Sequence, residues 1–171
     1  MKGGGMYKVS EHVVHRFCGV CLVKDIAPLN PNDPESPIYY VLNPLFGEDS
    51  RNTVRVPVAN PSSLRSPLTK EEAVRLIETW PNPEQSLYIV DSKRRKTCYQ
   101  EALSTGDLTL IAPLLAGAMQ RKKREGHLNS MDAQFVQRAE PLLYGEVSFA
   151  LGIPYDEAIT YIHDHSKGIV D

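Results

Sequence analysis

The chain has 171 residues, of which 42% are hydrophobic and 23% are charged, and its net charge is −2 at pH 7. This composition is typical of a folded globular protein and excludes wholesale disorder, which needs low hydrophobicity and a large net charge. No apolar run approaches the ~18 residues that cross a bilayer, and residues 1–6 lack the apolar stretch of a signal peptide. The three cysteines are too few for a disulfide framework. We therefore expect a cytoplasmic protein with reduced thiols and no membrane association.

The first 66 residues have the pattern of short strands. Pieces rich in β-prone residues alternate with turn-rich stretches, and they lie at 7–9, 12–14, 19–26, 38–42 and 53–58. Residues 28–37 form a loop with four prolines, and residues 46–50 are suited to a hairpin connection. This pattern predicts a small antiparallel β-barrel. Because Pro57 has no backbone N–H to donate, the last strand should end there or lie at a sheet edge.

Residues 67–171 predict an all-helical domain of about five helices, which follows a linker at 60–67. Thr69 and Glu72 form a capping box for the first helix, and Pro81 stops it. Three further helices are expected at about 91–103, 107–126 and 130–150, and a fifth after Pro154. Pro141 should kink the fourth. The predicted fold class is α+β, with a β-domain at 1–66 and a helical domain at 67–171.

Two basic runs hold eight of the 19 lysines and arginines: Lys93, Arg94, Arg95 and Lys96, and Arg121, Lys122, Lys123 and Arg124. The short turn at 104–106 should make the two helices that carry them antiparallel. At 1.5 Å rise per residue, the runs are then offset by only ~9 Å along the hairpin. We therefore predict one positive surface that binds phosphate groups. The alternative is two solvated helix surfaces, the second of which merely complements a helix C-terminus.

One cluster has the residue types of a zinc site, namely His12, His15, Cys18 and Cys21. Its spacing of three sends consecutive ligands to opposite faces of an extended chain, and no helix follows the cysteine pair as a redox motif requires. We therefore expect ordinary core and surface residues here, and neither a metal nor another cofactor. His163, Asp164 and His165 are expected in a solvated tail.

The chain contains none of the familiar catalytic or nucleotide-binding motifs, such as a nucleophile elbow, a phosphate-binding loop or a metalloprotease helix. Its acidic residues are spread along the expected helix surfaces. We predict that the protein is not an enzyme and has no small-molecule substrate.

An ordered set of local strings resembles the CarD/CdnL family of bacterial transcription regulators, over about residues 6 to 151. In the β-domain these strings are 7–14, 19–20, 39–42, 53–60 and 64–65. In the helical domain they are 94–95, 103–107, 128–130 and 139–146. The string at 53–60, Thr-Val-Arg-Val-Pro-Val-Ala-Asn, is the most telling.

The resemblance implies a Tudor-like β-domain, similar to that of the transcription-repair coupling factor, which docks on the RNA polymerase β subunit through a sheet edge. The residues it assigns to this docking are Thr53, Val54, Arg55, Val56 and Pro57. It also implies a helical domain that contacts promoter DNA, at the phosphate backbone and in the minor groove, to stabilise the open complex. That expectation agrees with an edge strand suited to β-augmentation and a basic surface without a base-reading motif.

The sequence departs from the family pattern at one place. Many members carry a tryptophan just before the double arginine, as a wedge in the minor groove, whereas Ser92 or a neighbour stands there in this chain. Trp80 lies upstream and is expected to pack in the core. Tyr88 is the other aromatic residue near this position and is the alternative candidate to replace the wedge. The loop at 28–37 is also longer than in the family. Two other functions stay open: a protein-interaction module without DNA binding, and a zinc-stabilised adaptor.

Overall fold

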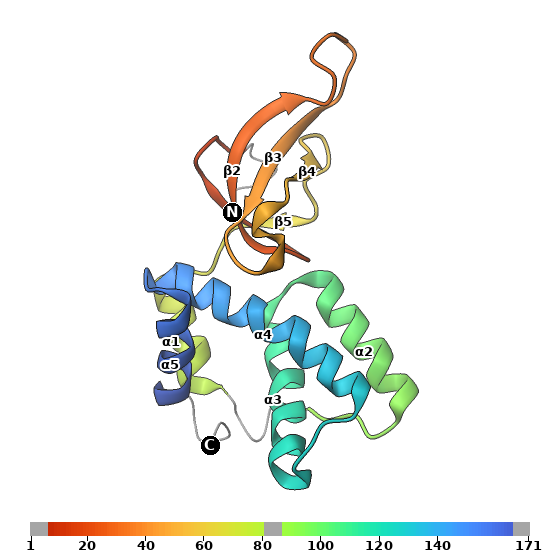
Figure 1. Cartoon of the computed structure of the whole chain (residues 1–171), viewed down its shortest axis with the longest axis vertical. Coiled ribbons are helices and arrows are strands. Elements are labelled where there is room, and N and C mark those ends of the chain that lie inside the picture. Colours follow the sequence, from red (N-terminus) through yellow and green to blue (C-terminus); the bar gives the residue numbers. More distant parts are fainter. Residues whose placement is uncertain (1–6, 81–86, 166–171) are drawn as a thin grey trace. The chain divides into compact units, whose positions relative to one another are not determined.

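The computed structural model describes residues 7–80 and 87–165. The chain divides into two compact units, Met1–Pro67 and Leu68–Asp171. Within the described residues, the first holds an antiparallel sheet of five strands and the second holds five helices (Figure 1). The predicted α+β class is confirmed.

The sheet of the first unit is curled, and its strand order is β4-β3-β2-β1-β5 (Figure 1). The strands are β1 (His12–His15), β2 (Gly19–Pro28), β3 (Ile38–Pro44), β4 (Val54–Pro57) and β5 (Leu64–Arg65). Every neighbouring pair is antiparallel, and a bulge shifts the register of β2 against β3 between Val23 and Asp25. Because side chains alternate across a strand, one face collects the core. That core contains Val13, Cys21, Val23, Tyr40, Leu42, Val56 and Leu64.

The edges of the sheet are formed by β4 and β5. As predicted, the strand that contains Pro57 lies at an edge and ends at that residue. Two details differ from expectation. Residues 7–9 are not a strand, and Leu64 and Arg65, expected in the linker, form the fifth strand. A two-residue strand has no periodicity to detect, and its pairing with β1 and the burial of Leu64 in the core place it.

The helices of the second unit begin and end where the sequence signals them. They are α1 (Lys70–Thr79), α2 (Ser92–Thr105), α3 (Leu108–Glu125), α4 (Ser130–Leu151) and α5 (Tyr155–His165). The side chains of Thr69, Asp91, Asp107 and Asn129 each accept a backbone N–H in the first turn that follows. Gly106 and Gly126 close α2 and α3 with positive φ angles. Helix α4 continues through Pro141. His163, Asp164 and His165 are exposed in the last turn of α5.

The fourth helix is the centre of the helical unit, because α1, α2, α3 and α5 all pack against it. Its side chains Phe135, Ala139, Leu143 and Val147 enter a core shared with Ile111 and Leu115 of α3. Phe135 stacks flat on Tyr99 of α2, with ring centroids 3.9 Å apart. None of the helices in the described part of the chain is long and apolar enough to cross a membrane.

His15 organises the turn between β1 and β2. Its Nδ1 atom accepts the backbone N–H of Phe17 at 3.2 Å and that of Cys18 at 3.3 Å. Burial of the ring, and then the nearby Arg16 guanidinium, lower the pKa of His15 below its ordinary value. An imidazolium Nδ1 carries a proton and cannot accept either bond. The turn therefore requires a neutral ring.

We predict that the first unit loses stability as the pH falls below about 6.5, the ordinary pKa of histidine in the unfolded chain. The folded-state pKa is lower, so the unfolded chain takes up the proton first. Full stability is present above that value and is lost between it and the folded pKa. Hydrogen exchange of the β1 and β2 amides at pH 5.5 to 7.5 measures the effect. In His15→Asn, a non-titrating acceptor should remove this pH dependence; an unchanged profile would contradict the assignment.

Candidate nucleic-acid interface

The first basic run occupies the first turns of α2. Asp91 caps this helix, since its Oδ1 atom accepts the backbone N–H of Arg94 at 2.8 Å. Lys93, Arg94 and Lys96 are exposed. These three side chains are therefore free to form one part of a positive surface.

Arg95 does not join them, and the prediction that it contacts DNA is corrected here. Its side chain is buried, because it shares the inward face of α2 with Tyr99 and Ala102, four and seven residues later. Its Nε atom forms an ion pair with Asp132 Oδ1 at 2.9 Å. A guanidinium that is buried and paired within the fold is not available to a phosphate of DNA.

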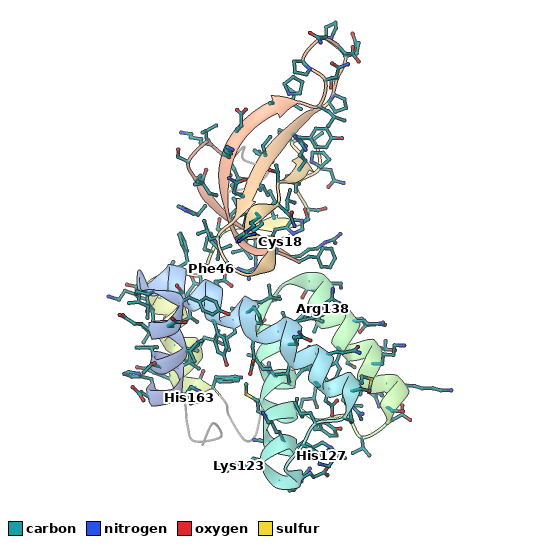
Figure 2. All side chains as sticks on the ribbon, viewed as in Figure 1. Cys18, Phe46, Lys123, His127, Arg138 and His163 are labelled. Atoms are coloured by element: carbon teal, nitrogen blue, oxygen red, sulfur yellow. The ribbon has the colours of Figure 1, made fainter. Side chains whose placement is uncertain are left out.

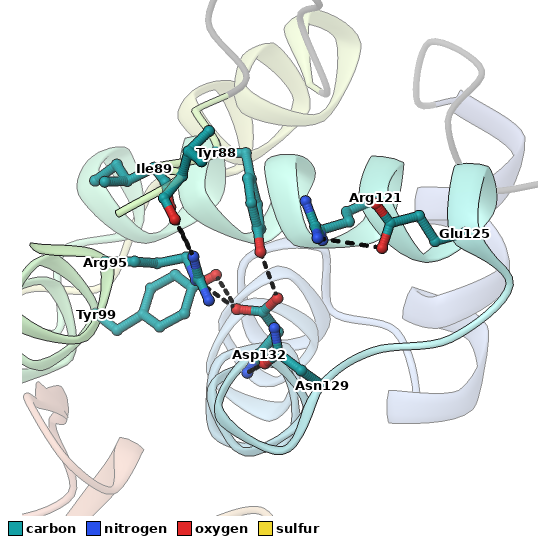
Figure 3. Close-up of polar contacts among 9 residues, drawn as sticks. Tyr88, Ile89, Arg95, Tyr99, Arg121, Glu125, Asn129 and Asp132 are labelled. Carbon is teal, nitrogen blue, oxygen red and sulfur yellow. Dashed lines mark hydrogen bonds and ion pairs between the residues drawn. The ribbon is translucent and has the colours of Figure 1, made fainter. Parts of the chain in front are cut away.

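Asp132, in the first turn of α4, is the centre of a buried polar network (Figure 3). Its side chain is fully buried, and its Oδ1 atom accepts hydrogen bonds from Arg95 Nε and from the Tyr99 hydroxyl at 3.0 Å. Its Oδ2 atom accepts the hydroxyl of Tyr88 at 2.9 Å. The buried carboxylate thus has a cation and two hydroxyl donors as partners, which is the condition for keeping a charge inside a protein.

Tyr88 belongs to a segment that lies directly on α3. The backbone N–H of Leu87 donates to the carbonyl of Pro113 at 3.1 Å. The segment crosses α3 at Gly117, where a Cβ atom would lie only 2.3 Å from the carbonyl oxygen of Leu87. At its far end, Nη1 of Arg95 donates to the carbonyls of Ile89 and Val90 at 2.8 and 3.1 Å. Backbone contacts therefore fix both ends of this segment.

The ring of Tyr88 joins the two basic runs (Figure 3). The guanidinium carbon of Arg95 lies 4.8 Å from the ring centroid, and that of Arg121 lies 4.6 Å from it. Both distances are within the range of a cation–π contact. Arg121 also pairs with Glu125, with 3.2 Å between Nη2 and Oε2. One arginine from each run thus rests against the same aromatic ring.

The pKa values of the two tyrosines that bind Asp132 are both raised. For Tyr88 and Tyr99 the largest cause is burial, and the neighbouring carboxylate adds to it. Both hydroxyls therefore keep their protons at neutral pH and act as donors to Asp132.

The second basic run lies at the C-terminal end of α3. Lys122, Lys123 and Arg124 are exposed, and Figure 2 labels Lys123 on α3 and His127 in the turn that follows it. Cations in a last helical turn are favoured by the helix dipole. We call the seven partly or fully exposed basic residues of both runs the basic surface: Lys93, Arg94, Lys96, Arg121, Lys122, Lys123 and Arg124.

The proposed polymerase-docking residues lie in and just before the edge strand β4. Thr53, Arg55 and Pro57 are exposed, and Arg55 points away from the sheet face that carries Val54 and Val56. Val56 is buried in the core, so its side chain is not available to a partner, and only its backbone lies along the edge.

In the cluster with zinc-like residue types, the side chains of His15 and Cys21 bind backbone groups of their own turn. His15 Nδ1 accepts two backbone N–H groups, and the Cys21 thiol donates to the carbonyl of Gly19 at 3.4 Å. Within the described residues, no three histidines, cysteines or acidic residues are grouped so that they could hold a metal ion.

The helical unit matches a known protein family. A family model described as "CarD, C-terminal domain" matches residues 82–163, which include α2, α3, α4 and most of α5. The chain belongs to the CarD family. No curated protein matches the chain. CarD proteins are associated with transcription, so this chain is a transcription-associated protein. Both basic runs and the Asp132 network lie within the CarD match.

In this CarD protein the aromatic residues near the double arginine are held by internal contacts. Trp80 is buried, as predicted, and its Nε1 atom donates to the carbonyl of Ala112 at 2.7 Å. Tyr88 is bound through its hydroxyl and between two guanidinium groups. The positions nearest the family's tryptophan hold exposed Ser92 and Val90, whose side chain is 83% exposed. Trp80 and Tyr88 are thus both held by contacts within the helical unit.

Sequence reasoning missed Asp132, Tyr99 and the burial of Arg95. The signal for Arg95 was its spacing from Tyr99 and Ala102, which puts all three on one helix face. Nothing in the local sequence of Asp132 marks it, since an acidic residue in a first helical turn is usual on a surface.

We predict that Asp132→Asn destabilises the CarD domain by about 3–5 kcal/mol, the usual cost of leaving one partner of a buried ion pair alone. Asparagine keeps the size of the side chain and removes the charge that Arg95 requires. Urea unfolding followed by the fluorescence of the buried Trp80 measures the change. Glu101→Gln, an exposed charge removal on α2, should stay within about 0.5 kcal/mol. Equal stability of both variants would show that the ion pair is not needed.

Proposed function

We propose that this CarD protein binds duplex DNA without sequence preference through its basic surface and binds the RNA polymerase β subunit through the edge strand β4. Together the two contacts would stabilise the open promoter complex. The single observation that carries the DNA-binding part is the position of the cations on α2.

Cations in the first turn of a helix oppose the helix dipole, whose N-terminal end is positive. Yet Lys93, Arg94 and Lys96 are exposed in the first turns of α2, and that first turn contains no acidic residue. Their place is therefore not explained by helix stability. An anionic ligand explains it, because exposed lysine and arginine side chains bind phosphate groups.

The second run strengthens this interpretation. Lys122, Lys123 and Arg124 on α3 suit the helix dipole and alone would indicate only a solvated helix end. However, Arg95 and Arg121 meet at Tyr88, so the two runs lie together. Long flexible lysine and arginine side chains without a base-reading element favour phosphate contacts over sequence recognition.

The edge strand β4 supports the second part of the proposal. In the described residues β3 is its neighbour on one side and no strand pairs with the other, which leaves an edge to which an extended segment can add. The exposed guanidinium of Arg55 has the geometry to pair with carboxylates of a partner.

The competing function is a protein-interaction module whose basic residues are only solvated. An interaction module would use the same edge strand β4 to bind its partner, but it would not bind DNA. A zinc-stabilised adaptor receives no support, because the described residues contain no cluster suited to a metal.

We predict that the full chain binds duplex DNA with a Kd on the order of 10⁻⁴–10⁻⁶ M at physiological salt, independent of sequence. Lys93→Gln with Arg94→Gln should weaken binding to all sequences alike, and so should Lys122→Gln with Lys123→Gln. Each phosphate contact that is lost should flatten the dependence of log Kd on log salt by about one unit. Fluorescence anisotropy at several salt concentrations measures both quantities.

The matched control for this experiment removes the same charges from α1. Lys70→Gln with Arg75→Gln changes two exposed cations on a helix that packs on α4 and α5 rather than on α2. This control should bind like the wild type. Identical curves for all three double variants would leave the interaction module as the better explanation.

We also predict that Arg55→Glu reduces retention of RNA polymerase in a pull-down while changing stability by only about 0.5 kcal/mol, since the side chain is exposed. Lys24→Glu reverses an exposed charge on β2, two strands from β4, and should retain polymerase normally. If the folded Arg55 variant retains as much polymerase as the Lys24 variant, β4 is not the docking edge.

A further inference from the structure

The environment of Arg121 differs from that of the other cations of the basic surface. Its guanidinium rests on the Tyr88 ring at 4.6 Å and pairs with Glu125 at 3.2 Å, and its side chain is still 30% exposed. Lys122, Lys123 and Arg124 extend from the same end of α3 and are exposed. Arg121 is therefore the member of the second run that the fold holds in one place.

The contacts of Tyr88 are rigid. Its hydroxyl is bound to a fully buried carboxylate, its chain neighbour Leu87 is bonded to α3, and the close crossing at Gly117 prevents the segment from moving toward the helix. An aromatic ring fixed in this way presents one face to Arg121. Stacking on such a face orients the planar guanidinium without using its N–H donors.

The pair with Glu125 has the opposite effect. It occupies part of the hydrogen-bonding edge of the guanidinium, the same edge that a phosphate needs. A surface carboxylate that binds Arg121 also repels a phosphate group that approaches it. Glu125 and a DNA phosphate are thus competing anions for one arginine.

We propose that Tyr88 is a positioning residue that holds Arg121 ready for a DNA phosphate, and that Glu125 is an internal competitor which lowers the affinity of this site. The inference rests on the proposed DNA binding and adds how one contact is organised and weakened. It makes two predictions of opposite sign.

The first arm of the test removes the ring. In anisotropy titrations with the full chain, Tyr88→Leu should weaken duplex binding about 2–5-fold, the range expected for an exposed cation–π contact. It should also flatten the salt dependence toward that of Arg121→Gln. Tyr88→Phe keeps the ring but loses the bond to Asp132 that helps to fix it, so its affinity for the duplex should lie between that of the wild type and that of Tyr88→Leu. Arg121→Gln should reduce the affinity for DNA less in the Tyr88→Leu variant than in the wild type. Lys123→Gln should reduce the affinity by the same factor in the wild type and in Tyr88→Leu.

The second arm removes the competitor. Glu125→Gln should strengthen binding by up to about 5-fold, the range of an exposed ion pair. This exposed substitution does not threaten the fold, so it tests the role of Glu125 even if Tyr88→Leu fails to fold, in which case Tyr88→Phe tests the position of the ring. Removal of any acidic charge also raises the affinity for DNA through long-range electrostatics. The same substitution in the Arg121→Gln variant measures this non-specific part alone. There the gain from Glu125→Gln should nearly vanish.

The outcomes separate this inference from the proposed function. If the wild type does not bind DNA, both fail. If the wild type binds but Tyr88→Leu has the same Kd and salt dependence, Tyr88 does not position Arg121 and only the inference fails. An equal gain from Glu125→Gln with and without Arg121 would overturn the role of Glu125 as a competitor.

Discussion

The buried carboxylate of Asp132 constrains the whole face of the helical unit that carries the basic residues. A buried charge requires hydrogen-bond donors around it, and these come from two other parts of the chain: Arg95 and Tyr99 on α2, and Tyr88 in the segment before it. Because these donors must converge, the start of α2, the segment that crosses α3 and the first turn of α4 are brought together. The polar network thus sets the geometry that hydrophobic packing alone would leave loose, since apolar contacts are not directional.

This arrangement divides a basic run into parts with different roles. Four consecutive cations on a helix cannot all face one way, since successive residues are rotated by about 100°. On α2 the rotation turns Arg95 inward to neutralise Asp132 and leaves Lys93, Arg94 and Lys96 in solvent. Arginine suits the inward position because it keeps its charge and has several N–H donors, three of whose hydrogen bonds are formed here. The basic run on α2 therefore contributes one residue to the core of the helical unit and three to its surface.

The helix boundaries could be predicted because each is marked by its own local chemistry: a capping side chain such as Asp91 or Asn129, or a glycine at the end. The edge position of β4 likewise followed from Pro57. The strand β5 and the role of Asp132 could not be predicted, because each depends on contacts between segments far apart in sequence. Arg95 is intermediate. The spacing of Arg95 from Tyr99 and Ala102 indicates its burial, but the basic residues on either side of it indicate an exposed charged surface.

The proposed function does not need strong binding at either surface. A small set of phosphate contacts gives only weak, salt-sensitive affinity for duplex DNA. An edge strand of four residues offers few backbone hydrogen bonds to a partner. However, a protein held on the polymerase through one unit experiences promoter DNA at a high effective concentration, and the second contact becomes intramolecular. Weak contacts then act only where polymerase and DNA are already together. An internal competitor such as Glu125 fits this logic, because it suppresses binding to free DNA more than it limits binding once the protein is tethered.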